Sequence, residues 1–104
     1  MTSAERSPYE IILAPDAKDH LAGFEAGERA ALLDAMEEQL ASEPSAQTRK
    51  RKRMRPNPLA PWELRVHRLR VYYEVDEAAH EVHILAIGVK DRERVTIAGE
   101  TFTL

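Results

Sequence analysis

Two runs of alternating apolar and polar residues, separated by only two residues, constrain the fold of this chain more than any other feature. The runs are Trp62–Val66 and Leu69–Asp76, with His67 and Arg68 between them. A two-residue connection between runs of this kind is typical of a tight antiparallel β-hairpin. The chain is therefore expected to contain a sheet built around this hairpin.

The hairpin register separates a predicted core face from a predicted polar face, because side chains alternate along a strand. On the polar face, Arg65 lies directly opposite Arg70. Two opposed arginines destabilise a strand pair unless acidic neighbours form a charge ladder with them or an anionic ligand lies between them. Both readings remain open. The predicted polar face consists of Glu63, Arg65, Arg70, Tyr72 and Glu74, and the core face of Leu64, Val66, Leu69, Val71, Tyr73 and Val75.

Upstream of the hairpin, the sequence predicts one strand and two helices. Tyr9–Ala14 has the length and apolar content of a strand, and Pro15 suits the first position of a helix. Gly27 is expected to end this first helix, and a second helix is expected over Glu28–Ser42. The buried face of the second helix is predicted to contain Leu33, Met36 and Leu40.

Downstream of the hairpin, the sequence predicts a turn at Glu77–His80, a long strand over Glu81–Gly88 and a small terminal hairpin within residues 95–104. Residues 43–61 contain four prolines and are expected to form a loop with at most a short strand. The order β-α-α-β-β-β indicates an α+β fold, with an N-terminal strand and a helical hairpin packed on a twisted, mainly antiparallel sheet of four or five strands. At this length, residues 1–104 are expected to form a single domain.

The charge is distributed unevenly along the chain, although the formal net charge is only −3. Residues 1–48 carry three Lys/Arg and ten Asp/Glu, residues 49–70 carry nine and one, and residues 71–104 carry three and seven, so the net charges are −7, +8 and −4. Like charges this concentrated repel one another unless an anion neutralises them, which makes the central segment a candidate contact for RNA or DNA. A solvated basic loop balanced by acidic helices is the alternative.

Several classes of protein are disfavoured by composition. The chain has no cysteine, which excludes disulfides, thiolate catalysis and Cys-based zinc sites. His80 and His83 are the only close histidine pair, and without a third ligand they indicate a surface pair and no metal site. No apolar run reaches the roughly 18 residues that a membrane span needs, and no secretory signal is present, so a cytoplasmic location is expected.

The residues Trp62-Glu63-Leu64-Arg65-Val66-His67-Arg68-Leu69-Arg70-Val71-Tyr72-Tyr73-Glu74-Val75 resemble the signature hairpin of the RelE/ParE toxins, which belong to bacterial type II toxin–antitoxin systems. That signature reads roughly as an aromatic residue, any residue, Leu or Ile, Arg or Lys and Val, then a short turn, and then Tyr or Leu, Arg, Val or Leu, any residue and Tyr. The resemblance continues upstream through Leu40–Pro44 and downstream through Ile84–Lys90. It implies a toxin domain of the fold predicted above.

The RelE branch cleaves mRNA on the ribosome, and the resemblance implies a role for five residues. Arg70 corresponds to the arginine that grips the scissile phosphate, Arg65 to a basic residue of the preceding strand, and Lys90 to a basic residue after the next strand. Glu63 replaces a lysine of the best-known member, although some RelE-like relatives use a glutamate as base. Tyr72 shares the arginine face and is expected to stack on a base, to act as an acid or to be a surface aromatic.

The family's catalytic tyrosine near the C-terminus has no counterpart here, since Thr96 or Ile97 falls near its position. Proton transfer is therefore assigned to Glu63, Tyr72 or His67, without metal or cofactor and with a 2′,3′-cyclic phosphate as product. The expected partners are mRNA, the ribosome and a cognate antitoxin in a hetero-oligomer, and no membrane. The residues expected to contact RNA or the ribosome are Arg49, Lys50, Arg51, Lys52, Arg53, Arg55, Arg68, Arg92 and Arg94.

Two other functions fit the same sequence. The ParE branch shares the fold and inhibits DNA gyrase without cleaving RNA, and the missing tyrosine and lysine favour it. A degenerate toxin that only binds its antitoxin is the third possibility. The basic run and the Arg65/Arg70 pair favour the ribonuclease.

Overall fold

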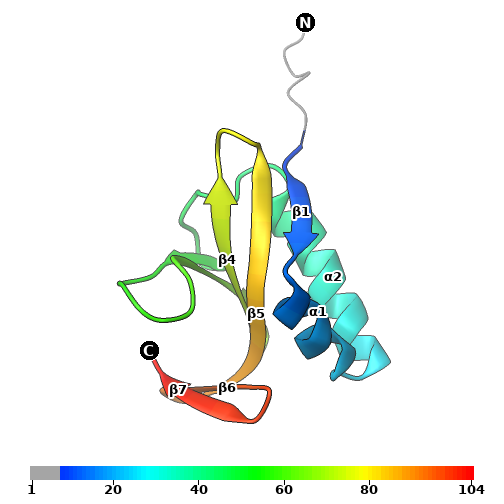
Figure 1. Ribbon diagram of the computed structural model, residues 1–104, viewed down its shortest axis with the longest axis vertical. Helices are drawn as coiled ribbons and strands as arrows, with labels where there is room; N and C mark the ends of the chain where they lie inside the picture. Colours follow the sequence, from blue (N-terminus) through cyan, green and yellow to red (C-terminus); the bar gives the residue numbers. More distant parts are fainter. Residues whose placement is uncertain (1–7) are drawn as a thin grey trace, which may run out of the picture.

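The computed structural model describes residues 8–104, so residues 1–7 of the expected domain lie outside the described part. It is a curved sheet with two helices packed on one side (Figure 1). The elements are β1 (Glu10–Leu13), α1 (Pro15–Ala22), α2 (Ala26–Leu40), β2 (Arg51–Arg53), β3 (Trp62–Val66), β4 (Leu69–Asp76), β5 (Glu81–Asp91), β6 (Arg94–Ile97) and β7 (Glu100–Thr103).

The predicted α+β fold class and element order are confirmed, but the sheet is larger than expected. Within residues 8–104 it has seven strands in the order β2-β3-β4-β5-β6-β7, with β1 paired to β5, where four or five strands were expected. The difference arises because the basic segment Arg51–Arg53 pairs with β3 and the terminal hairpin extends the sheet through β6 and β7.

The β3–β4 hairpin has the register that the sequence predicts. Arg65 pairs with Arg70 and Val66 with Leu69. His67 begins the two-residue turn with a φ of 58°, in the left-handed region that tight hairpin turns require and that histidine tolerates better than most residues.

β5 is the central strand of the sheet. β4 lies along one edge, while the other edge is shared by β1, which runs parallel to the first half of β5, and by β6, which runs antiparallel to the second half. β5 extends to Asp91, beyond the predicted end at Gly88. Gly88 continues the strand because a Cβ atom there would lie 2.6 Å from the Thr96 carbonyl oxygen and from Ile97, so only glycine admits β6 at this distance.

α2 packs on the sheet through Leu32, Met36 and Leu40, which are almost fully buried. The predicted use of Leu33 in this face is wrong, since its side chain is 46% exposed. Positions 32 and 33 both lie about one helical turn before Met36, at spacings of four and three residues, and the sheet packs on the side of position 32.

The predicted helix boundaries also need correction. A capping box formed by Glu25 and Glu28 begins α2 at Ala26, so Gly27 lies in its first turn instead of ending α1. The break between the helices falls at residues 23–25, and α2 ends at Leu40, two residues before the predicted end.

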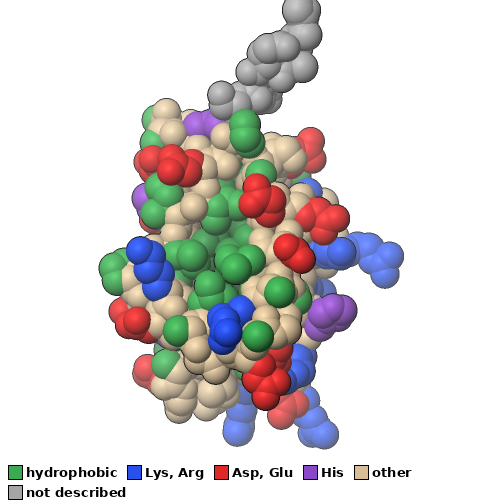
Figure 2. Space-filling view, turned by 90° about the vertical axis from the view of Figure 1, so that its right-hand side faces the viewer, with side chains coloured by type: hydrophobic (Ala, Val, Ile, Leu, Met, Phe, Trp, Pro, Cys, Tyr) green, Lys and Arg blue, Asp and Glu red, His purple; other side chains and the backbone are tan. Residues whose placement is uncertain are grey.

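The side of the molecule that carries α1 and α2 is partly apolar. Figure 2 views this side and shows hydrophobic side chains gathered near its middle, with acidic side chains around them. Leu21, Ala31 and Ala35 of these helices, and Phe24 of the break between them, are hydrophobic residues that are only partly buried against the core. No helix in residues 8–104 is long and apolar enough to cross a membrane.

Candidate active site

The sheet face opposite the helices is covered by the 54–61 loop and by the β6–β7 hairpin, which lie on that side in Figure 1. Glu63 and Tyr72 are consequently only 2% and 0% exposed. The expectation that Tyr72 lies on an open face, as a surface aromatic or a base-stacking platform, is therefore wrong. The apolar cluster under this cover consists of Ala60, Tyr72, Ala86, Val95 and Ile97.

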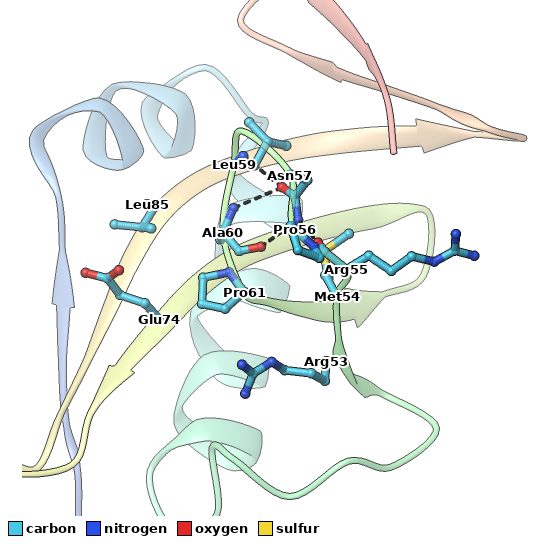
Figure 3. A pocket seen from close by; sticks show the side chains of 10 residues that line it. All are labelled: Arg53, Met54, Arg55, Pro56, Asn57, Leu59, Ala60, Pro61, Glu74 and Leu85. Carbon is cyan, nitrogen blue, oxygen red and sulfur yellow. Dashed lines mark hydrogen bonds between the residues drawn. The ribbon is translucent and has the colours of Figure 1, made fainter.

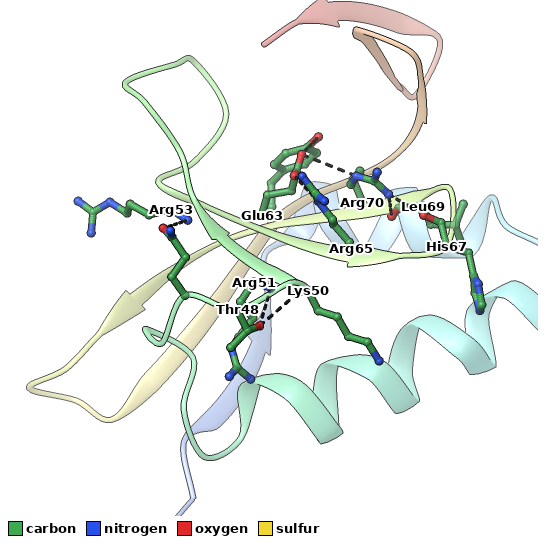
Figure 4. A network of polar contacts seen from close by, with 11 residues as sticks. Thr48, Lys50, Arg51, Arg53, Glu63, Arg65, His67, Leu69 and Arg70 are labelled. Carbon is green, nitrogen blue, oxygen red and sulfur yellow. Dashed lines mark hydrogen bonds and ion pairs between the residues drawn. The ribbon is translucent and has the colours of Figure 1, made fainter.

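Glu63 is the centre of a buried polar network (Figure 4). The Tyr72 hydroxyl donates a 3.0 Å hydrogen bond to Oε2 of Glu63 from the directly opposed position on β4. Nε of Arg65 lies 3.7 Å from Oε1, and Nε of Arg70 lies 3.9 Å from Oε2. The carboxylate thus compensates both arginines, which is the charge-ladder arrangement that the sequence left open.

The environment of Tyr72 keeps its phenol protonated. Burial, together with the adjacent Glu63 carboxylate, raises the pKa of Tyr72 above its ordinary value of 10.0. A hydroxyl with a raised pKa remains a hydrogen-bond donor at neutral pH and gives up its proton less readily. Tyr72 therefore positions the Glu63 carboxylate.

Arg65 and Arg70 differ in how much of the side chain is exposed to a ligand. Arg70 has a side chain 13% exposed, and its NH1 group donates to the carbonyl oxygens of His67 and Leu69, at 2.7 and 2.9 Å. Its buried Nε has no hydrogen-bond partner, because 3.9 Å from Glu63 is an ion-pair distance and too long for a hydrogen bond. Arg65 has a side chain 46% exposed. Arg65 is thus the more available cation of the pair.

A cleft of about 540 Å³ opens above this network, between the segment that follows β2 and the end of β7. Glu63 and Lys90 both line this cleft, although they come from β3 and β5. Carboxylate and ammonium groups in one cleft are the pair that acid–base chemistry needs. The cleft is lined by Lys52, Arg53, Met54, Arg55, Pro56, Asn57, Pro58, Glu63, Lys90, Thr103 and Leu104.

The structure separates the basic residues that the sequence grouped together. Arg51 points away from the cleft and is 8% exposed, with its Nε donating to the Ala46 carbonyl and its NH1 to the Gln39 carbonyl, at 2.8 and 2.6 Å. Lys50 lines a groove between α2 and the β3–β4 hairpin. Arg68 pairs with Glu28 at 3.1 Å on the molecular surface. Outside the cleft lining lie Arg49, Lys50, Arg51, Arg65, Arg68, Arg70, Arg92 and Arg94.

The sequence did not identify the uncharged walls of the cleft. Thr103 and Leu104 join it because β7 folds back beside the segment after β2. Asn57 was missed as well, although an asparagine between prolines is a recognisable turn signal.

The structure brings together one group of possible metal ligands within residues 8–104, which includes His83 but not His80. Asp76, Glu81 and His83 bring one ligand atom each to within 4.8 Å of one another, because Asp76 pairs with Glu81 across the β4–β5 turn. His80 lies apart from them and stacks on the Tyr9 ring at 3.8 Å. The Glu81 carboxylate already accepts a 2.9 Å hydrogen bond from Nε2 of His83, so these two surface side chains also satisfy each other without a metal.

The fold is the RelE-like toxin fold, as the hairpin resemblance predicted. A chain of the crystal structure of the toxin–antitoxin complex RelBE2 from Mycobacterium tuberculosis superposes with a TM-score of 0.70 and 22% sequence identity, over 83% of this chain and 95% of that chain. No family model and no curated protein sequence matches the chain.

Proposed function

We propose that this chain is the toxin of a toxin–antitoxin pair and that it acts in the cytoplasm as a metal-free endoribonuclease on ribosome-bound mRNA. The observation that carries the proposal is the presence of Glu63 in a cleft with Lys52 and Lys90. A carboxylate can take a proton from a ribose hydroxyl, and the surrounding cations can hold the negative phosphate.

The reaction we assign to the cleft is transesterification at one phosphodiester. Glu63 accepts the proton of the 2′-hydroxyl, the 2′-oxygen bonds to phosphorus, and the bond from phosphorus to the 5′-oxygen breaks. The Lys90 ammonium protonates the departing 5′-oxygen. The products are a 2′,3′-cyclic phosphate and a 5′-hydroxyl, so atoms and charges balance without another reactant.

Three further cations support the developing charge in this mechanism. Lys52 and Arg55 line the cleft and would hold the phosphate oxygens, and the half-exposed Arg65 beside Glu63 would add a cation. Arg70, with NH1 engaged by backbone carbonyls, would act mainly by positioning Glu63. This differs from the direct phosphate grip that the family resemblance implies for Arg70.

Gyrase inhibition is the second candidate, because Tyr72 is buried beside Glu63, no tyrosine of residues 8–104 lines the cleft, and the β6 position expected for a catalytic tyrosine holds Thr96. The two functions separate in a paired experiment: primer extension on cellular mRNA after induction of the protein, and a gyrase supercoiling assay with the purified protein. Cuts spaced by codons support the ribonuclease. Loss of supercoiling without cuts overturns it.

An antitoxin partner follows from the same proposal. The partly apolar helix side and the cationic cleft are two surfaces that an acidic, amphipathic polypeptide would cover, with formation of a hetero-oligomer. The test is co-expression with the small open reading frame adjacent to the gene. Relief of growth inhibition and co-purification are expected, and the absence of both would contradict the toxin–antitoxin proposal.

A further inference from the structure

A second hollow of about 450 Å³ lies beside the cleft, and we call it the loop pocket. It is bounded on one side by the 54–61 loop and on the other by Glu74 of β4 and Leu85 of β5 (Figure 3). The segment of residues 53–57 lines both the loop pocket and the cleft, so the two hollows share one wall. A polynucleotide chain bound in the cleft would pass directly beside the loop pocket.

The walls of the loop pocket are mainly apolar. Met54, Pro56, Leu59, Pro61 and Leu85 line it. Single-stranded RNA is recognised through bases that leave the stack and bury their faces on apolar or aromatic side chains. The loop pocket is large enough to admit a planar heterocycle, and its apolar lining suits the faces of one.

The loop pocket is held open by the loop's own hydrogen bonds. The Asn57 amide donates to the carbonyl oxygens of Arg55 and Ala60, at 2.7 and 2.9 Å, and its oxygen accepts from the Leu59 backbone at 2.8 Å. Met54 N–H donates to the Pro61 carbonyl at 2.8 Å and closes the base of the loop. A preformed pocket spares the ligand the cost of ordering the loop.

Glu74 supplies the polar edge of the loop pocket. Its carboxylate is exposed and makes no hydrogen bond or ion pair within residues 8–104. An ionised carboxylate accepts hydrogen bonds and donates none. Guanine offers two adjacent donors, N1–H and the 2-amino group, which match the two carboxylate oxygens. Cytosine and adenine each offer one amino group, and uracil places carbonyl oxygens beside the charge.

We infer that the loop pocket binds a guanine base of the RNA, adjacent to the nucleotide held in the cleft, with Glu74 accepting hydrogen bonds from the base edge. This inference rests on the proposed function in one respect, that the ligand of the neighbouring cleft is RNA.

The test is an NMR titration of the ¹⁵N-labelled full chain with GMP, UMP and inorganic phosphate. GMP is expected to shift the amide signals of Leu59, Glu74 and Leu85, and UMP to shift them less. Inorganic phosphate should shift only signals around Lys90. Glu74→Gln, whose amide cannot accept both bonds, should weaken GMP binding on the order of tenfold and reduce the preference over UMP.

The matched control is Glu81→Gln, which removes a carboxylate from β5 outside the loop pocket and should leave GMP binding unchanged. The inference is overturned if GMP shifts only the signals near Lys90, or if Glu74→Gln and Glu81→Gln bind GMP equally. Shifts at the loop pocket together with an uncut mRNA in primer extension would leave the base pocket standing and reject the ribonuclease.

Discussion

Tyr72 and Glu63 face each other across β3 and β4, and the Tyr72 hydroxyl donates a 3.0 Å hydrogen bond to the Glu63 carboxylate. Neither residue is exposed by more than 2%. A carboxylate in this position needs its donors, because a buried charge without partners is costly. The tyrosine, with its raised pKa, thus fixes where the carboxylate meets the cleft.

Tyr72→Phe should weaken growth inhibition and lower the free energy of unfolding by about 1–3 kcal/mol, because it removes one donor from a buried carboxylate. Tyr73→Phe is the matched control, since it also loses one buried hydrogen bond, of 2.8 Å to the Pro44 carbonyl, on the other side of the sheet. Denaturant unfolding and growth assays on both variants check this. Equal losses of toxicity in the two variants would contradict the positioning role.

Glu63→Gln should reduce RNA cleavage by about a hundredfold or more, because an amide cannot accept the ribose proton. Circular dichroism establishes that the variant is folded, which matters because two arginines lose their counter-charge. Primer extension with matched protein amounts measures the effect. Cleavage at the wild-type rate by folded Glu63→Gln would exclude this residue as the base.

Neutralising different residues of the basic run at positions 49–55 should affect either ribosome binding or stability, depending on where the side chain lies. Lys52→Ala and Arg55→Ala should each lower the slope of log affinity against log salt for ribosome binding by about 0.7–1, because each removes one phosphate contact. Arg51→Ala should leave the slope unchanged and reduce thermal stability, since its guanidinium holds the Ala46 and Gln39 carbonyls. A filter-binding series at several salt concentrations decides between these outcomes.

Stability should depend on pH through Glu77. Hydrogen bonds from Tyr9 (2.5 Å) and Ser45 (2.9 Å) hold the pKa of this carboxyl below its ordinary value. A pKa that is lower in the folded state stabilises the fold above the unfolded value and loses that contribution as pH falls. The melting temperatures of wild type and Glu77→Gln should therefore differ at neutral pH and converge as the pH falls through the lowered folded-state pKa of Glu77. A constant difference would contradict this.

Replacing Gly88 and Gly27 by alanine should change the stability of the protein in opposite directions. Gly88→Ala should destabilise the protein, because the new methyl group would meet backbone of β6 at 2.6 Å. Gly27→Ala has open space around it in the first turn of α2 and should stabilise by up to about 1 kcal/mol. Melting temperatures of the two variants, compared with that of the wild type, show whether each replacement lowers or raises stability as expected.

The β3–β4 hairpin could be predicted because the residues that define it are close together in the sequence. Alternation along β3 and β4 and a two-residue turn define register, so the pairing of Arg65 with Arg70 and of Glu63 with Tyr72 follows from the sequence. The helix face could not be placed as well, since Leu32 and Leu33 are equally apolar and only packing on the sheet distinguishes them.

The candidate site depended on contacts that no local pattern encodes. Burial of Glu63 and Tyr72 results from the 54–61 loop and the β6–β7 hairpin, which come from opposite ends of the sheet. Arg51 and Lys52 look alike in sequence, yet strand alternation turns one towards α2 and the other towards the cleft. Side-chain direction there depends on the short strand β2, whose pairing the sequence left open.

The position of β5 has a consequence for synthesis on the ribosome. Among the strands of residues 8–104, β1 pairs with β5 alone, and the cleft includes Lys90 of β5 and Thr103 of β7. The helices and β1 therefore emerge well before the strand that they pack on, and long-range pairing of this kind is slow to form. We expect the nascent chain to carry no assembled cleft until β7 has been translated, so that the ribosome making this protein is not exposed to the cleft while the preceding strands are being synthesised.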